Sequence, residues 1–296
     1  MLSEEFYKEE IRQNYRITTE MKKAWAVELE IMLELDRVCK ALSINFFLDC
    51  GTLLGAIRDN HFIPWDDDID VVMLREDYDK LLNDGIHLFG SDYLFQCAYT
   101  DTNYPRGHAQ LRKKNTCAMI PYEAKHVQFD QSIFIDIFVL EGLPDSQDLL
   151  KKQFDEKQKI MKRMSIMGIP ASTKPINTII KKILKVVFTV VYPSIPEMFK
   201  QYEDICKRYS YQNSPELGRL MFHESVDKVY KLKREWFEKP IWIKFEGIDV
   251  PVPNGYDDIL RTYYGDNYMI PVNSGAYHDG LIICVDRSYK EVLKDL

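Results

Sequence analysis

Three features are scarce in this chain of 296 residues: long apolar runs, closely spaced cysteines and a surplus of basic residues. The six cysteines are scattered without a C-x-x-C pair, which is typical of reduced thiols in a cytoplasmic protein. The formal net charge of −7 argues against a nucleic-acid partner, because phosphate backbones attract basic surfaces. The beginning, Met1–Glu5, is acidic and lacks the apolar segment of a signal peptide, so we expect a cytoplasmic location.

A Gly-Thr turn and a group of acids are present instead, about one short helix apart. The apolar run Phe46–Leu48 predicts a buried strand, and Gly51 and Thr52 then open a short helix that ends at Arg58. The first backbone N–H groups of such a helix can face an anion. This layout is typical of a site that binds phosphate.

The acids follow Pro64 in the run Asp66-Asp67-Asp68-Ile69-Asp70, where β-branched residues begin to dominate. On a strand, alternate residues share a face, so Asp66, Asp68 and Asp70 are expected to point in one direction. Three like charges on one face repel unless a cation lies between them. Oxygen ligands without nearby histidine or cysteine favour Mg²⁺ or Mn²⁺ over zinc.

Three other interpretations of this run are less favourable. A solvated acidic loop is the usual role of a charge run, but this one continues directly into an apolar strand. An EF-hand loop starting at Asp66 would have Val71 where its sharp turn needs glycine. The segment from Asp68 to Val72 also mimics the nucleophile motif of haloacid-dehalogenase-type phosphatases, but it lacks the apolar strand that should precede that motif.

The pattern G-T-L-L-G-x-x-R followed by I-P-W-D-D-D-x-D, from Gly51 to Asp70, resembles the LicD family. This family is the phosphotransferase-like branch of the nucleotidyltransferase superfamily, and it also contains fukutin and fukutin-related protein. Weaker similarity continues through residues 75–78, 134–138 and 264–266. The resemblance implies an α/β (α+β) fold, with a nucleotidyltransferase-type mixed sheet flanked by helices and a helical insertion.

The resemblance also implies a metal site with a D-x-D pair on one strand and a third carboxylate on a neighbouring strand. The pair is Asp68 and Asp70. The third ligand is predicted to be Asp136, the lone acid in the apolar run 132–139, because a buried carboxylate needs a partner such as a metal or a salt bridge. Asp66 and Asp67 are expected to orient the loop or support the ligands.

Four residues are candidates for binding the phosphates of a nucleotide-activated donor. Gly51 and Thr52 would let the phosphates approach the backbone closely. Arg58 is expected either to bind a phosphate or to pair with the acidic run. Arg112 lies in a stretch similar to the L-R-x-x-x-T segment of the family.

Residues 1–144 and 236–296 are predicted to form the catalytic domain, with 145–235 as a mostly helical, basic insertion. A helix is expected over Thr19–Leu42, with an apolar stripe that contains Trp25, Leu29, Met32, Leu33 and Val38. Near the end of the chain, a hairpin is expected over 241–252, followed by a helix that ends near Tyr264. His278 follows, where members of the family often carry a histidine.

The segment from Lys151 to Lys185 contains ten Lys/Arg residues and only two acids. It leads into the apolar run Ile183–Tyr192, which is too short to span a bilayer. Such a segment can lie at an anionic membrane surface, or it can be a packing helix with a solvated basic face.

The resemblance predicts an Mg²⁺- or Mn²⁺-dependent phosphotransferase. It would move phosphocholine or a polyol phosphate from a cytidine diphosphate donor to a hydroxyl of a cell-surface glycan or its lipid-linked precursor. The alternatives are nucleotidyl transfer to a small molecule or sugar and a non-catalytic regulatory role. The intact D-x-D pair and Asp136 argue against the last of these.

Overall fold

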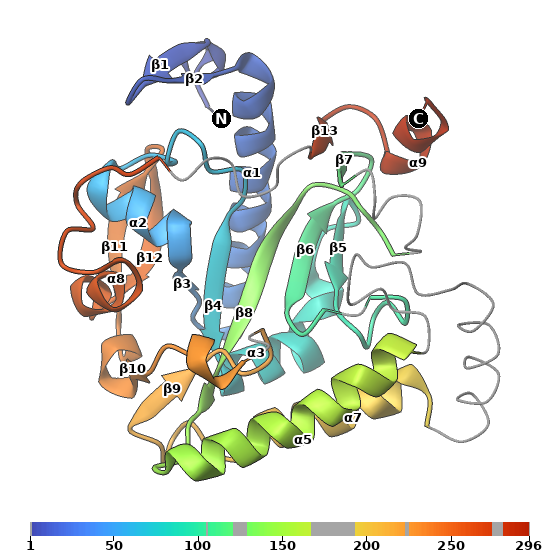
Figure 1. The fold of residues 1–296 in the computed structure, drawn as a ribbon. Helices are drawn as coiled ribbons and strands as arrows, with labels where there is room; N and C mark the ends of the chain where they lie inside the picture. The colour runs from blue at the N-terminus through green and yellow to red at the C-terminus, as the bar shows by residue number, and fades with distance from the viewer. Residues whose placement is uncertain are drawn as a thin grey trace.

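The computed structural model describes residues 2–104, 106–120, 129–166, 193–222, 225–273 and 281–295. These residues form a mixed α/β fold in which helices flank a mixed sheet (Figure 1). The predicted fold class is confirmed. None of the helices in these ranges is long and apolar enough to cross a membrane.

The main sheet has seven strands within the described ranges, and its central strand is β8 (Phe134–Gly142), whose residues are all buried. Strand β4 (Asp70–Leu74) pairs with β8 in parallel, and β6 (Ala109–Lys113) pairs with it in the antiparallel direction. The other strands of this sheet are β3 (Phe47–Leu48), β5 (Tyr93–Gln96), β9 (Glu216–Gly218) and β10 (Leu232–Lys233). The parallel pairing brings Asp70 directly opposite Asp136.

Helix α1 (Thr19–Leu42) has the predicted bounds and packs against the sheet at β6 and β8. The Thr18 hydroxyl accepts a hydrogen bond from the Met21 N–H at 3.2 Å and caps its first turn. Trp25 and Leu29 lie in the core, as predicted. Leu33 was wrongly placed in this stripe, because it lies about 100° around the helix from Met32 and is 44% exposed.

The predicted C-terminal hairpin is confirmed as β11 (Pro240–Phe245) and β12 (Ile248–Pro253), followed by α8 (Tyr256–Tyr264). Its turn contains Glu246 and Gly247, which both have positive φ. The Glu246 N–H donates to the Asn60 carbonyl at 3.0 Å, which ties the hairpin to the segment after α2 (Cys50–Arg58). The hairpin, α8 and α2 lie together beside β3 (Figure 1).

Helices α5 (Gln147–Ile166) and α7 (Ile195–Cys206) lie side by side at the lower end of the sheet in Figure 1. Their apolar residues form a hydrophobic cluster of their own with Leu220 and Met221. Strands β9 and β10, which follow α7 in the chain, nevertheless join the main sheet. The domain boundaries given above stay a prediction.

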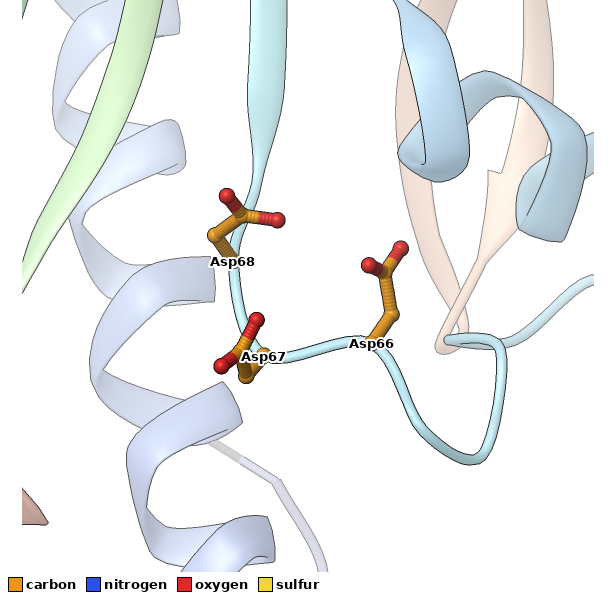
Figure 2. Close-up of side chains that lie close together, drawn as sticks. All are labelled: Asp66, Asp67 and Asp68. Carbon is orange, nitrogen blue, oxygen red and sulfur yellow. The ribbon is translucent and has the colours of Figure 1, made fainter. Parts of the chain in front are cut away.

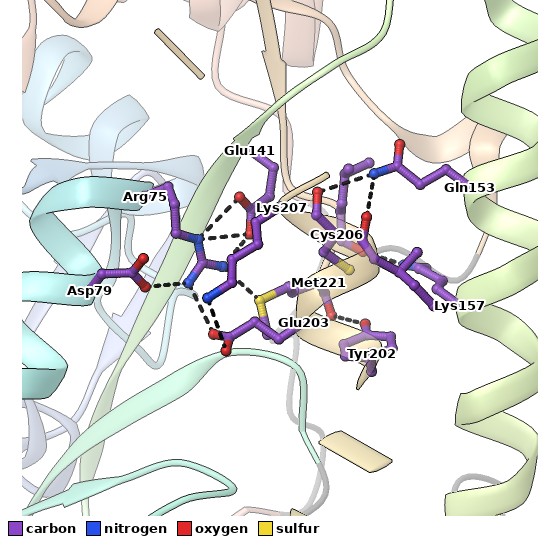
Figure 3. Close-up of polar contacts among 12 residues, drawn as sticks. Arg75, Asp79, Glu141, Gln153, Lys157, Tyr202, Glu203, Cys206, Lys207 and Met221 are labelled. Atoms are coloured by element: carbon purple, nitrogen blue, oxygen red, sulfur yellow. Dashed lines mark hydrogen bonds and ion pairs between the residues drawn. The ribbon is translucent and has the colours of Figure 1, made fainter. Parts of the chain in front are cut away.

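Arg75, at the start of α3 (Arg75–Lys80), connects this helical pair to the sheet (Figure 3). Its guanidinium donates to Glu141 of β8 at 3.0 Å, to Glu203 of α7 at 3.0 Å and to Asp79 at 2.9 Å. Arg75, Glu141 and Glu203 are all buried. One buried cation therefore balances carboxylates from the central strand and from α7.

Short elements complete the described fold. They are η1 (Glu4–Tyr7), β1 (Glu10–Arg12), β2 (Tyr15–Ile17), η2 (Leu81–Gly85), η3 (Ile86–Leu88), β7 (Cys117–Met119), η4 (Val226–Lys228), η5 (Arg234–Phe237), β13 (Ile282–Cys284), α9 (Tyr289–Val292) and η6 (Leu293–Asp295).

Candidate metal and phosphate site

Asp68, Asp70 and Asp136 meet where β4 begins, beside the first residues of β8. One carboxylate oxygen from each lies within 4.8 Å of the others. The backbone fixes this arrangement, since the Asp136 N–H donates to the Ile69 carbonyl at 2.9 Å. The Asp70 N–H donates to the Thr52 hydroxyl at 2.9 Å, which links the acids to α2. The structure thus brings together the three residues predicted as metal ligands.

The strand that carries these acids begins later than expected. Strand β4 starts at Asp70, and residues 66–69 form a lead-in that pairs with no neighbouring strand as part of a ladder. The strict alternation expected for a strand therefore does not hold over this segment. As a result, Asp67 lies near Asp66 and Asp68 instead of pointing away from them.

Burial and like charges act differently on the two paired acids. Burial, and then the charges of Asp68 and Asp136, raise the pKa of Asp70 well above its ordinary value. Burial also acts to raise the pKa of Asp136, but the proximity of His108 and Arg106 and a hydrogen bond from Gln110 bring it below its ordinary value. Ionising all three acids together is therefore costly without a nearby cation.

Strand β6 and the residue just before it supply the side chains that contact Asp136. The Gln110 side-chain amide donates to Asp136 Oδ1 at 2.7 Å, and His108 Nε2 lies 3.3 Å from the same oxygen. Arg112 donates to the Gln110 side chain and, at 2.5 Å, to Gln96 Oε1. His108 and Gln110 were not predicted, although Gln110 and Arg112 are alternate residues of β6 and His108 directly precedes the strand.

The four predicted phosphate-binding residues occupy different surroundings. Gly51 lies against Asp66, since a Cβ atom at this position would come within 2.5 Å of Asp66 Oδ2. The Thr52 hydroxyl holds the Asp70 backbone, as described above.

The two arginines among these residues have protein partners. Arg58, at the far end of α2, pairs with Asp59 at 2.8 Å rather than with the acidic run. Arg112 is buried, and this burial lowers its pKa to about 10. Phosphate binding by Gly51, Thr52, Arg58 and Arg112 stays a prediction.

A buried arginine at the start of α2, Arg219, was not predicted. Arg219, which follows β9, donates to Asp49 Oδ2 at 3.1 Å and to Cys50 Sγ at 2.7 Å. The Tyr263 hydroxyl of α8 donates to Asp49 Oδ1 at 3.1 Å. Cys50 has a φ of 48°, in the left-handed region that is strained for a residue with a side chain. These contacts hold the N-terminal end of α2 next to the acids.

The acidic run and α1 together contribute a group of four carboxylates, from Asp66, Asp67, Asp68 and Glu28. Figure 2 shows Asp66, Asp67 and Asp68 close together, with α1 passing beside Asp67. Trp25 of α1 donates its indole N–H to the Asp66 carbonyl at 3.1 Å. Glu28, one turn further along α1, is buried, and this burial together with Asp68, Asp67 and Asp66 raises its pKa well above the ordinary value.

The donor set of Asp68, Asp70 and Asp136 fits a hard divalent cation. Three carboxylates supply only oxygen ligands, which Mg²⁺ and Mn²⁺ prefer. A cation between them would also relieve the repulsion that raises the pKa of Asp70. His278 and the residues from 167 to 192, including the run Ile183–Tyr192, lie outside the described ranges.

Comparisons with known proteins show which sequences this chain resembles. A family model described as "LicD/FKTN/FKRP, nucleotidyltransferase domain" matches residues 43–140. The lipopolysaccharide cholinephosphotransferase LicD of Haemophilus influenzae is 27% identical over 243 residues, which are 82% of this chain and 89% of that protein. Uncharacterized proteins of Rickettsia typhi and Rickettsia prowazekii are each 35% identical over 65 residues, 22% of this chain and 20% and 23% of their own lengths.

The matched region contains all of the carboxylates that meet beside β8, as well as α2, β4, β6 and most of β8. The similarity to the Haemophilus influenzae protein extends well beyond this region. Residues 43–140 therefore match the nucleotidyltransferase domain of the LicD family, and most of the chain is similar to one LicD protein.

Proposed function

We propose that the protein is a metal-dependent phosphotransferase, which moves a phospho-alcohol from a cytidine diphosphate donor to a hydroxyl of a cell-surface glycan or its lipid-linked precursor. The observation that carries the proposal is the convergence of Asp68, Asp70 and Asp136 inside the LicD-type domain. The cholinephosphotransferase relative acts, by its name, on lipopolysaccharide, which supports transfer to a glycan.

The carboxylates would hold Mg²⁺ or Mn²⁺, which when bound neutralises diphosphate charge and stabilises the departing nucleotide. The chain itself fixes the positions of these ligands. Thr52 and the β4–β8 pairing hold Asp70, while Gln110 holds Asp136. This arrangement needs little reorganisation when substrate binds.

The transfer itself is a displacement at phosphorus. The acceptor oxygen forms a bond to the phosphorus that carries the alcohol, and the bond from that phosphorus to the bridging oxygen breaks. Cytidine monophosphate leaves with the bridging oxygen. The proton of the acceptor hydroxyl passes to a carboxylate of the site.

Aromatic side chains near the acids support choline as the alcohol. Phe222 and Tyr264 are 46% and 44% exposed. The Phe222 ring lies 5.7 Å from that of His108, which contacts Asp136. Exposed rings of this kind attract a quaternary ammonium group through their π faces. We therefore place phosphocholine ahead of a polyol phosphate.

A donor panel tests this function. The chain is incubated with Mg²⁺ or Mn²⁺ and with cytidine diphosphate derivatives of choline, ribitol and glycerol, and mass spectrometry measures cytidine monophosphate. We expect release from the choline donor, dependent on metal. Asp136→Asn should lower metal affinity and release together, by tenfold or more.

Two outcomes would contradict the proposal. Cleavage of cytidine triphosphate to pyrophosphate, with no release from any diphosphate donor, would indicate nucleotidyl transfer to a small molecule or sugar instead. Full activity of Asp136→Asn together with a lower melting temperature would make Asp136 a structural acid and not a metal ligand.

A further inference from the structure

The acidic run contains a second carboxylate group besides the one that faces β8. One oxygen each from Asp66, Asp67 and Asp68 lies within 4.8 Å of the others. This group shares Asp68 with the first but otherwise uses different residues. In Figure 2 the Asp67 and Asp68 side chains lie beside α1, and Asp66 lies on their other side. Acidic clusters are common without a bound ion, so the residues around this cluster determine whether it can hold a cation.

Glu28 of α1 indicates that a ligand is needed beside this cluster. Its side chain is 3% exposed, and its Oε2 atom is buried without a hydrogen bond to any residue of the described ranges. A buried carboxylate oxygen without a partner is costly, and native proteins rarely leave one so. This oxygen needs a ligand that the described residues do not provide.

The position of Glu28 directs it towards the acidic run. Trp25 lies one turn earlier on the same face of α1, and its indole N–H is hydrogen-bonded to the Asp66 carbonyl at 3.1 Å. Lys22, one further turn back, is directed elsewhere, since it pairs with Glu10 at 3.0 Å. Asp68, Asp67 and Asp66, all of the same sign as an ionised Glu28, lie close enough to act on it electrostatically.

We propose that Glu28, Asp66, Asp67 and Asp68 bind a second divalent cation, of the Mg²⁺, Mn²⁺ or Ca²⁺ class. The cation gives the buried Glu28 oxygen its missing partner and joins α1 to the segment before β4. Asp68 bridges the two sites, so the second cation also holds the Asp68 carboxylate in place for the first. The second site does not depend on which reaction the first supports.

Metal-binding stoichiometry tests the second site directly. The full chain is stripped with chelator and titrated with Mn²⁺ alone, with free Mn²⁺ measured by electron paramagnetic resonance. Wild type should bind two ions per chain. Glu28→Gln and Asp67→Asn should each bind one, whereas the double variant Asp67→Asn/Asp136→Asn should bind none. Glu20→Gln, an exposed change in the first turn of the same helix, should still bind two.

Folding is checked by thermal melting in chelator, where Glu28→Gln keeps the shape of the side chain and removes its charge. Glu28 lies on α1 and Asp67 lies in the segment before β4. If one of the two variants does not fold, the other still tests the site. Binding of a single ion by wild type would overturn the proposal. So would two ions with unchanged affinities in both Glu28→Gln and Asp67→Asn.

Discussion

Asp70 and Asp136 lie directly opposite each other on parallel strands, but their surroundings shift their pKa values in opposite directions. Asp136 has a hydrogen bond from Gln110 and is next to His108, which favour its charged form. Asp70 is buried and lies next to other acids, and both effects disfavour its charged form. In the metal-free protein, Asp70 is therefore the member of the pair whose ionisation opposes folding.

This difference predicts a pH dependence of stability without metal. The folded chain holds a proton on Asp70 above pH 3.8, the ordinary pKa at which an unfolded aspartate releases it. The free energy of unfolding therefore decreases as the pH rises from the pKa of Asp70 in the unfolded chain towards its higher pKa in the folded chain. We expect Asp70→Asn to reduce this decrease, measured by thermal melting in chelator from about pH 4 to about pH 8.

Asp84→Asn, a change of an exposed acid, provides the matched control and should melt like wild type at each pH. Saturating Mg²⁺ should remove the difference at the upper end of the range, because the cation then balances the Asp70 charge. An identical pH dependence in wild type and Asp70→Asn would show that burial of Asp70 has no energetic cost.

The residues of the site differ in how well the sequence predicted their positions. Asp68, Asp70 and Asp136 could be placed because a D-x-D pair and one acid in an apolar strand are local patterns. Glu28 and His108 could not be placed, because nothing near them in the chain marks them. They acquire their surroundings only when α1 and β6 pack beside the acids.

At the scale of elements, helix α1 and the C-terminal hairpin were predicted with nearly their observed bounds, because their apolar periodicity and turn residues are local signals. The start of β4 was predicted less accurately. The alternating pattern of residues 66–69 predicted a strand, but among the described residues the neighbouring strands pair only with Asp70 and the residues after it. Pairing across the sheet therefore decides where this strand begins.

Arg75 is the main buried connection between helix α7 and the sheet, among the ion pairs described above. Arg75→Met should lower the free energy of unfolding by about 3 to 5 kcal/mol, because it leaves the buried Glu141 and Glu203 without their cation. Denaturant unfolding measures this loss. The double variant Arg75→Met/Glu141→Gln should be more stable than Arg75→Met alone.

A matched control for this prediction is Arg261→Met, which breaks exposed ion pairs with Asp257 and Asp266. It should change the free energy of unfolding by less than about 1 kcal/mol. A similarly small loss in Arg75→Met would mean that water reaches the buried carboxylates readily.

At the scale of the whole molecule, an acidic chain carries one basic segment, from Lys151 to Lys185. Part of it forms α5, and the rest, with the apolar run that follows, lies outside the described ranges. Contact between this segment and an anionic membrane stays a prediction. It is of interest because a lipid-linked glycan acceptor would be found at such a surface.

Sedimentation with anionic vesicles measures this contact. Replacement of Lys174, Lys181, Lys182 and Lys185 by Gln should release the protein, since each basic residue near the surface contributes about 1 kcal/mol. Replacement of Lys228, Lys239, Lys290 and Lys294, which are exposed, changes the net charge equally and should not release it. Equal sedimentation of both variants would contradict the prediction, and so would a lack of dependence on salt.

Our central claim is that Asp68, Asp70 and Asp136 are the metal ligands that support transfer. Release of cytidine monophosphate by Asp70→Asn, with saturating Mg²⁺ and the donor that wild type uses, tests this claim most directly. We predict no release above the metal-free background, from a protein that melts at or above the wild-type temperature in chelator. Asp84→Asn should match wild type. Wild-type turnover in Asp70→Asn would contradict the account.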